Sequence, residues 1–214
     1  MVGGPRFLRP LGRYSAPQGD EIGVWAASLA DTLPEAQAAR LLEPEEHARA
    51  ARFRFPHLRR RFVVGRALLR LLLADLLDTD AAALRFRYGP WGKPELVGEA
   101  LRFNVSHSED LAVFAVTERA PLGVDVEIER PIPEADALAR MYFSAVEQRA
   151  LAAAADDAKV RIFFTCWTRK EAYVKGLGEG LHRSLQQRPD KAWRILDLEI
   201  ARGAVAALAV CLPS

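Results

Sequence analysis

The chain has 214 residues, of which half are hydrophobic and 27% are charged, and its net charge is +2. These values predict a globular protein with one sizeable core or two small, tightly joined halves. So small a net charge does not indicate nucleic-acid binding, and no nucleic-acid motif occurs. The two cysteines, Cys166 and Cys211, form no CxxC pair. This argues against a zinc site or a disulfide framework and favours a reduced, cytoplasmic compartment.

Neither a signal peptide nor a membrane span is expected. The first 21 residues contain no apolar run of the length that a signal peptide needs. The most apolar helical stretch, residues 61–77, is interrupted by Arg66, Arg70 and Asp75, which is not typical of a membrane helix.

The predicted elements follow one order twice. The first round has a strand at 21–29, helical periodicity over 34–54 and 58–77, and strands at 84–88, 101–106 and 111–117. A loop rich in Gly and Pro is expected at 89–96. The second round has a strand at 121–130, helices at 134–141, 145–155 and 157–176, and strands at 192–200 and 204–212.

This repetition predicts the fold class and the domain organisation. Similar segments, "IGVWAAS" and "LGVDVEI", open the two rounds. We therefore expect an α+β fold built as a pseudo-twofold pair of similar α/β halves, residues 1–118 and 119–214. A cleft between two such halves is a common place for a ligand.

The segment "GVDVEIE" contains a candidate metal site. Because side chains alternate along a strand, Asp125 and Glu127 project on one side and Val124 and Val126 on the other. Two carboxylates on an otherwise apolar strand repel each other, and a divalent cation would relieve that repulsion. Ligands that are all oxygen favour Mg²⁺. The alternative is an exposed polar face of an edge strand.

The helix predicted at 157–176 contributes a third carboxylate. Glu171 lies on the same stripe as Phe163, Phe164 and Trp167, so it belongs to the apolar face, and Lys175 follows one turn later. The alternative is a surface Glu–Lys pair, which stabilises a helix by about 0.2–0.5 kcal/mol. Glycines at 176, 178 and 180 end the helix and would also allow a phosphate or pantetheine arm to approach closely.

Basic residues of the first half either form solvated helix faces or serve a polyanionic ligand in the cleft. They are Arg49, Arg52, Arg54, Arg59, Arg60, Arg61 and Lys93.

The segment "FNVSHSEDLAVFAV" raises the question of a Ser–His nucleophile pair. Adjacent residues of a strand point to opposite faces, so Ser106 and His107 would diverge, and no G-x-S-x-G elbow is present. A turn that offers hydroxyls, backbone N–H groups and an imidazole would instead suit an anion. We therefore interpret Ser106 and His107 as part of a turn that holds phosphate.

Four segments together resemble the Sfp-type 4′-phosphopantetheinyl transferases: "WGKP", "FNVSHS", "GVDVEIE" and "FFTCWTRKEAYVKGLGEGL". The chain is similar to the monomeric type with two halves, not to the short trimeric holo-(acyl carrier protein) synthases. The resemblance implies transfer of the 4′-phosphopantetheine arm of coenzyme A to a serine of an apo acyl, peptidyl or polyketide carrier protein. The other product would be adenosine 3′,5′-bisphosphate. Mg²⁺, or Mn²⁺, would be the cofactor, and no membrane or nucleic-acid partner is implied.

The resemblance also assigns roles to residues. Asp125, Glu127 and Glu171 would hold the metal, and Glu171, a neighbouring carboxylate or a water would deprotonate the carrier serine. Lys170, Lys175, Ser106 and His107 would contact the phosphates of coenzyme A, Lys175 also serving catalysis. Lys93, Arg61, Arg49 and Arg52 would bind the adenosine 3′-phosphate end.

Two residues depart from relatives in this region. Phe62 stands where relatives often have a hydroxyl residue, and Glu46 stands where some members have a basic one. Rival readings of the whole sequence are a non-catalytic module that binds coenzyme A or a nucleotide, a Mg²⁺-dependent phosphohydrolase, and a nucleic-acid binder.

Overall fold

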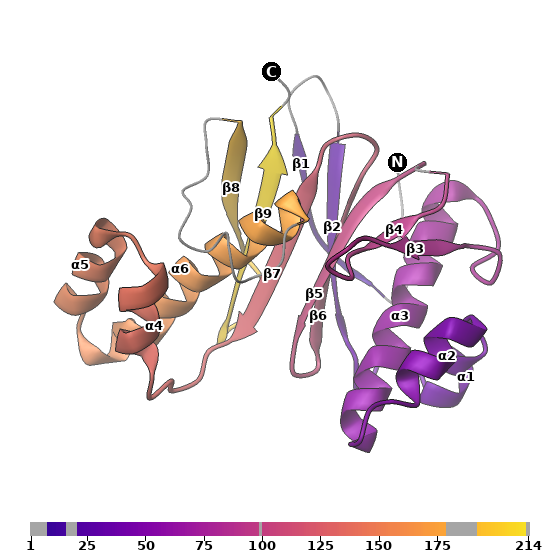
Figure 1. Ribbon diagram of the computed structural model, residues 1–214, viewed down its shortest axis with the longest axis horizontal. Helices are drawn as coiled ribbons and strands as arrows, with labels where there is room; N and C mark the ends of the chain where they lie inside the picture. The colour runs from indigo at the N-terminus through magenta and orange to yellow at the C-terminus, as the bar shows by residue number, and fades with distance from the viewer. Residues whose placement is uncertain (1–7, 16–20, 99, 179–191, 213–214) are drawn as a thin grey trace.

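The computed structural model describes residues 8–15, 21–98, 100–178 and 192–212. These residues form nine strands and six helices (Figure 1). The strands are β1 (Arg9–Ser15), β2 (Glu21–Ser28), β3 (Phe86–Tyr88), β4 (Pro94–Leu96), β5 (Arg102–Ser108), β6 (Leu111–Thr117), β7 (Leu122–Ile128), β8 (Trp193–Leu198) and β9 (Ala204–Cys211). The helices are α1 (Glu35–Ala39), α2 (Pro44–Ala50), α3 (Pro56–Leu77), α4 (Ala135–Tyr142), α5 (Ala145–Ala153) and α6 (Asp156–Leu177).

The first half is an antiparallel sheet covered by α3. Its strand order is β1-β2-β6-β5, with Trp25 of β2 opposite Phe114 of β6. Helix α3 begins with Pro56 in its first turn, where a missing N–H costs nothing, and its C-cap is Asp78 in the left-handed conformation. The core of this half places the apolar face of α3 against one face of the sheet.

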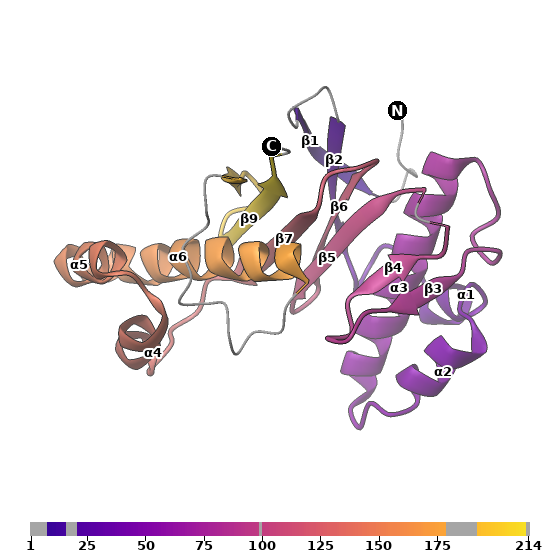
Figure 2. The same ribbon diagram turned by 45° about the horizontal axis from the view of Figure 1, so that its top comes forward.

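The second half is a three-stranded antiparallel sheet covered by α6. Its strand order is β7-β9-β8, so β7 is an edge strand, with Asp125 opposite Ala207 in β9. Helix α6 crosses β7 and β9, and α4 and α5 pack at its N-terminal end (Figure 2).

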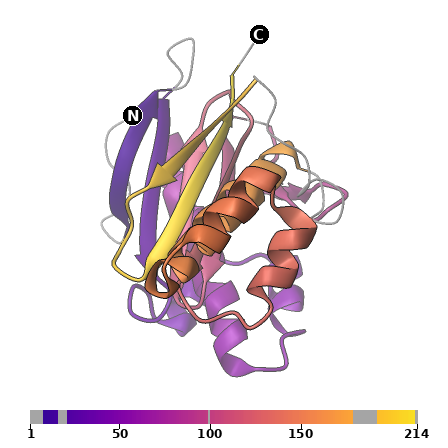
Figure 3. The same ribbon diagram turned by 90° about the vertical axis from the view of Figure 1, so that its left-hand side faces the viewer.

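The two sheets also pack against each other through a shared apolar layer. Alternate residues of β2 and β6 meet alternate residues of β7 and β9, among them Ile22, Val24, Val124 and Leu208, and all four are buried. The molecule thus has helices outside and two sheets inside, and Figure 3 shows α4–α6 on one side of β8–β9 and β1–β2 on the other. This arrangement brings the edge strands β5 and β7 together.

The α+β class and the order of elements agree with the sequence, but four expectations were wrong in detail. Strand β1 was not predicted, because Arg, Pro and Gly weaken its pattern; Pro10 is tolerated on this edge strand beside a register shift. The segment 34–54 forms two short helices, and β4 lies in the stretch expected to be a loop. Ser106 and His107 lie inside β5 and not in a turn; the turn after β5 is formed by Glu109 and Asp110.

The pseudo-twofold relation, the boundary at residue 118 and the monomeric state stay predictions. Among the described residues, no helix combines the length and the apolar character needed to cross a bilayer.

Candidate functional site

The site lies where β5 and β7 meet at the junction of the two halves. In the described residues no backbone ladder joins these strands; polar side chains of β5 bridge them instead. The Asn104 Oδ1 accepts a hydrogen bond from the Val124 N–H at 2.9 Å, and the Ser108 Oγ accepts one from the Ile128 N–H at 3.1 Å. Asn104, Ser106 and Ser108 share one face of β5, so the strand alternation aims all three at β7.

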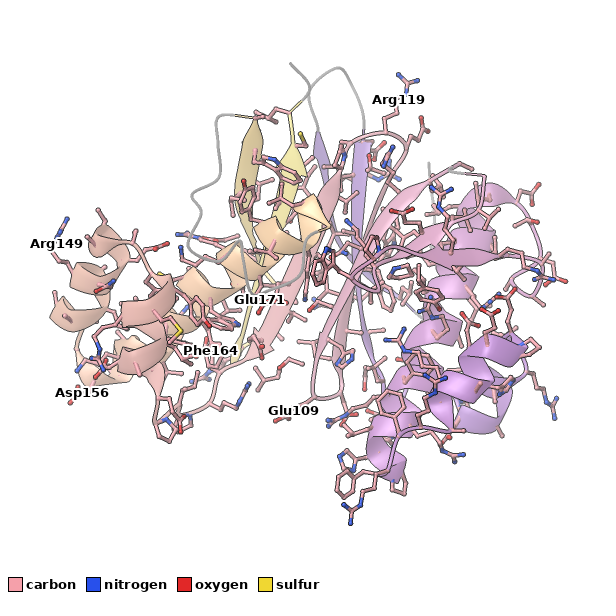
Figure 4. The ribbon with its side chains drawn as sticks, in the orientation of Figure 1. Glu109, Arg119, Arg149, Asp156, Phe164 and Glu171 are labelled. Carbon is pink, nitrogen blue, oxygen red and sulfur yellow. The ribbon has the colours of Figure 1, made fainter. Side chains whose placement is uncertain are left out.

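Two glycines bring α6 close to β7. A Cβ atom at Gly123 would collide with the carbonyl oxygen of Ala172 and the backbone nitrogen of Gly176, and one at Gly176 would collide with the Trp193 ring. Backbone therefore meets backbone at this crossing. Because Asp125 and Glu127 lie on the same face of β7 as Gly123, the crossing sets Glu171 of α6 over these carboxylates. Figure 4 shows Glu171 on α6 at the side that faces the junction.

Asp125 is the most buried carboxylate of the site, with 3% of its surface exposed. Its Oδ1 accepts hydrogen bonds from the Ser106 hydroxyl at 2.8 Å and from the Lys175 ammonium at 2.6 Å. Its Oδ2 is buried and has no hydrogen-bond partner. Burial raises the pKa of Asp125, and Lys175 opposes that rise. The free Oδ2 is thus an acceptor that folding leaves unused.

Glu127 and Glu171 flank Asp125 in different environments. The Glu127 Oε2 accepts a hydrogen bond from the Ser108 hydroxyl at 2.7 Å and one from Arg130 at 3.1 Å. Glu171 is 8% exposed, as its place on the apolar stripe predicted. Its burial and the negative charge of Asp125 raise the pKa of Glu171 to about 7. Negative charge is therefore in excess here.

The donor set fits a hard divalent cation, although the ligands are not gathered around one point. Among residues 8–15, 21–98, 100–178 and 192–212, no three His, Cys, Asp or Glu side chains are placed to hold a metal ion. The chemistry still fits, because three carboxylates share one buried region and the Asp125 Oδ2 lacks a partner.

Ser106 and His107 diverge as the strand alternation predicted. Ser106 is buried against Asp125, and its Oγ also accepts a hydrogen bond from the Lys175 ammonium at 2.9 Å. His107 is exposed on the opposite side of β5. Desolvation by the protein around the ring, together with the positive charges of Lys175 and Arg61, lowers the pKa of His107. Ser106 and His107 do not form a nucleophile–base pair.

The predicted arginines lie on the first half. Arg49 and Arg52 line a hollow of about 590 Å³ together with Phe53 and Tyr88. Arg61 is bound by Asp110 in the β5–β6 turn, with N···O distances of 3.0 and 3.3 Å. Arg49 and Arg52 are therefore grouped in a hollow, whereas Arg61 is already paired.

The two departures from relatives, Phe62 and Glu46, have structural roles. The Arg49 guanidinium lies 5.3 Å from the centre of the Phe62 ring, which suits a cation–π contact. Glu46 is 1% exposed and forms ion pairs with Arg70 at 2.8 Å and Arg66 at 3.3 Å.

Two predicted lysines lie apart from Asp125. Lys170 is buried and pairs with Glu147 of α5 at 3.2 Å. Lys93 donates to backbone carbonyls where α6 ends and β7 begins. Lys93 also lines a cavity of about 290 Å³, together with residues of both halves that include Phe103, Leu122 and Gly178. The motif positions 179–181, including Gly180, lie outside the described residues.

Sequence reasoning missed Asn104 and Ser108 as residues that position the site. Their signal was the period-two spacing of polar residues at 104, 106 and 108, which alternate with Phe103 and Val105 at the start of the strand. It missed Gly123 as well, whose need for space depends on a helix that is distant in sequence.

Comparisons with known proteins point to one kind of reaction. A family model described as "4′-phosphopantetheinyl transferase, N-terminal" matches residues 24–119, and one described as "4′-phosphopantetheinyl transferase superfamily" matches residues 121–208. The 4′-phosphopantetheinyl transferase HetI of Nostoc sp. is 37% identical over 212 residues, which cover 89% of this chain and 88% of that protein.

Two further relatives are more distant. The 4′-phosphopantetheinyl transferase psf-1 of Bacillus pumilus is 34% identical over 142 residues, covering 66% of this chain and 60% of that protein. The L-aminoadipate-semialdehyde dehydrogenase-phosphopantetheinyl transferase of Homo sapiens is 29% identical over 177 residues, covering 77% of this chain and 56% of that protein.

Proposed function

Because the chain belongs to the 4′-phosphopantetheinyl transferase superfamily and is a transferase, we propose that coenzyme A is its donor substrate and an apo carrier protein its acceptor. The serine oxygen of the carrier attacks the phosphorus next to the pantetheine arm. The bond from that phosphorus to the bridging oxygen breaks, and adenosine 3′,5′-bisphosphate leaves.

The observation that carries this proposal is the excess of carboxylate at the junction. Asp125, Glu127 and Glu171 share a buried region, and Asp125 keeps one oxygen without a partner. Burying such groups together is unfavourable unless a ligand compensates their charge. The proposal assigns that compensation to a divalent cation, Mg²⁺ or Mn²⁺, held by these three residues. When bound, the cation would neutralise charge on the reacting pyrophosphate.

The chain's own residues would bind the rest of coenzyme A. We assign the phosphates near the junction to Ser106 and Lys175, which lie at Asp125, and to His107, whose pKa is lowered by the positive charges of Lys175 and Arg61. Arg49 and Arg52 would take the 3′-phosphate in the hollow beside Tyr88, where guanidinium forks suit phosphate. Glu171 or a water beside it would accept the proton of the carrier serine.

A mass measurement tests the proposal. The protein is mixed with coenzyme A, Mg²⁺ and apo forms of an acyl, a peptidyl and a polyketide carrier domain. The expected result is that at least one carrier gains the mass of a phosphopantetheine group and that adenosine 3′,5′-bisphosphate appears in equal amount. No mass gain on any carrier would sink the proposal. Release of the bisphosphate without a carrier would instead favour a phosphohydrolase.

A further inference from the structure

Lys93 connects the two halves of the molecule at the end of α6. It belongs to the segment between β3 and β4 in the first half, yet its ammonium reaches elements of the second. The Lys93 Nζ lies 2.7 Å from the carbonyl oxygen of Lys175, 3.2 Å from that of Leu122 and 3.5 Å from that of Gly176. One side chain thus joins the last turn of α6 to the first residue of β7.

These three contacts use the hydrogen-bonding capacity of the group. An ammonium has three N–H donors and no acceptor, and three carbonyl oxygens surround this one. The C-terminal carbonyls of a helix carry partial negative charge and lack intrahelical partners, so a cation is favourable there. Burial of the side chain lowers the pKa of Lys93 to about 8. A phosphate would have to displace carbonyls to reach this ammonium.

The contact with Lys175 links Lys93 to the site. Lys93 holds the main-chain carbonyl of Lys175, whose side chain holds Asp125 and Ser106. The next residue, Gly176, has no room to move toward β7 or toward Trp193. The end of α6 is therefore fixed from three sides: by Gly123, by the Trp193 ring and by the Lys93 ammonium.

We propose that Lys93 is a positioning residue that fixes the end of α6, and through it the Lys175 ammonium at Asp125, and that it is not a ligand of a substrate phosphate. The proposal rests on the transferase reaction proposed above, for which it names a residue that acts through another. It replaces the expectation that Lys93 meets the 3′-phosphate of coenzyme A.

Two donor substrates distinguish a positioning role of Lys93 from a role in binding the 3′-phosphate. Lys93→Met is assayed with coenzyme A and with 3′-dephospho-coenzyme A, beside Arg49→Met, which lines the arginine hollow. We expect Lys93→Met to lower kcat by about 100-fold with both donors, because the groups at Asp125 would be displaced by this loss of support. The ratio of the two KM values should stay as in the parent. Arg49→Met should raise KM for coenzyme A and leave KM for the dephospho form near the parent value. An unchanged kcat in Lys93→Met, with a KM rise confined to coenzyme A, would overturn the proposal.

A measurement on the unaltered protein covers the case in which Lys93→Met does not fold. The protein is treated with acetic anhydride, with and without adenosine 3′,5′-bisphosphate, and acetylation of each lysine is read by peptide mass. We expect the bisphosphate to leave the acetylation rate of Lys93 unchanged, because carbonyl oxygens and not a phosphate hold its ammonium. A reaction of Lys93 that the bisphosphate suppresses would assign Lys93 to a phosphate and refute the proposal. Because this readout needs no turnover, it stands even if the transferase assay fails.

Discussion

The protein has two clusters of charge, one in the first half and one at the junction, and they differ in their balance. In the first half the buried Arg66 and Arg70 face Glu43 and Glu46, and the exposed Arg85 also pairs with Glu43, so every carboxylate there has a positive partner. At the junction three carboxylates meet one partly buried ammonium, that of Lys175, and the half-exposed Arg130. The first cluster holds elements together, whereas the second has the excess of negative charge to which we assign a cation.

The two clusters also differ in the hydrogen bonds that their charged groups form. Arg70 also donates to the carbonyl oxygens of Ala81 and Leu84, which ties α3 to the turn that follows it. The Glu46 Oε1 of this cluster has no hydrogen bond but lies 3.3 Å from the Arg66 Nε, whereas in the other cluster the Asp125 Oδ2 is buried without a hydrogen bond. A buried oxygen left in this way is costly unless a partner comes from outside. Four experiments can break or sharpen this distinction.

The largest effect is expected from Glu46→Gln. This change keeps the shape and the capping contact to the Glu43 N–H but removes the charge that Arg66 and Arg70 face. Leaving buried charge unpaired should lower the free energy of unfolding by about 3–5 kcal/mol, measured by urea denaturation. The matched control is Glu35→Gln, whose pair with Arg59 is largely exposed and should cost about 0–1 kcal/mol. Equal stability losses in the two variants would remove the distinction.

Asp125→Asn should act on activity and not on the fold. We expect kcat/KM for transfer to the carrier to fall by about 100- to 1000-fold, as when a preorganised electrostatic contact is lost. The Mg²⁺ concentration needed for half activity should rise. Asp197→Asn, which breaks an exposed pair with Arg169, is the control and should keep the parent rate. Unchanged turnover in Asp125→Asn would exclude this carboxylate from the site.

The pH dependence of stability tests the excess of negative charge. Glu171 has a pKa of about 7 in the folded protein against an ordinary value of 4.5, so the folded state binds its proton more tightly than the unfolded chain. In EDTA, the stability that this proton contributes is complete below pH 4.5 and is lost as the pH rises through about 7. The loss is at most roughly 3 kcal/mol.

The measurement is the free energy of unfolding from pH 4.5 to 8 for the parent and for Glu171→Gln. The parent should lose stability relative to the variant across this range, and Mg²⁺ should restore more of it at pH 8 than at pH 6. Parallel pH profiles for the two proteins would contradict the assigned pKa.

Ser108→Ala should have the smallest effect. The Ser108 hydroxyl donates to Glu127 and accepts from the Ile128 N–H, so its loss should cost about 1 kcal/mol of stability, with only a few-fold loss of activity. The control for activity is Ser28→Ala, which removes a hydroxyl that donates to Asp31 and accepts from the Ala30 and Asp31 N–H groups and which should leave the rate unchanged. A Ser108→Ala variant as stable as the parent would mean that the bridge between β5 and β7 does not depend on this hydroxyl.

Local patterns in the sequence were enough to predict the long helices and the carboxylate-bearing strand. The apolar stripe of α6 predicted the burial of Glu171, and alternation along β7 predicted that Asp125 and Glu127 share a face. Period-based reasoning succeeds in both cases because each element buries one face over several turns or residues. It failed for β1, whose pairing with β2 is set by tertiary contacts rather than by its own residues.

The partners of the lysines could not be predicted in the same way. Lys170 is the neighbour of Glu171 in sequence, but successive residues of a helix point about 100° apart, so Lys170 faces Glu147 of α5 instead. The acceptors of Lys93 are main-chain carbonyls more than 25 residues away, and a carbonyl leaves no trace in the sequence. Side-chain chemistry can be read from a sequence, whereas a backbone acceptor is known only when the fold is known.

The apolar layer between the two sheets limits how the substrate can enter. Swinging the halves apart on a hinge would hydrate Ile22, Val24, Leu208 and their neighbours, and each such side chain contributes about 1.5–3 kcal/mol when fully buried. Domain opening is therefore too costly to serve each turnover. Under the proposed function, coenzyme A would therefore reach the junction from its rim, and exchange of substrate and product would depend on local movements and not on separation of the two halves.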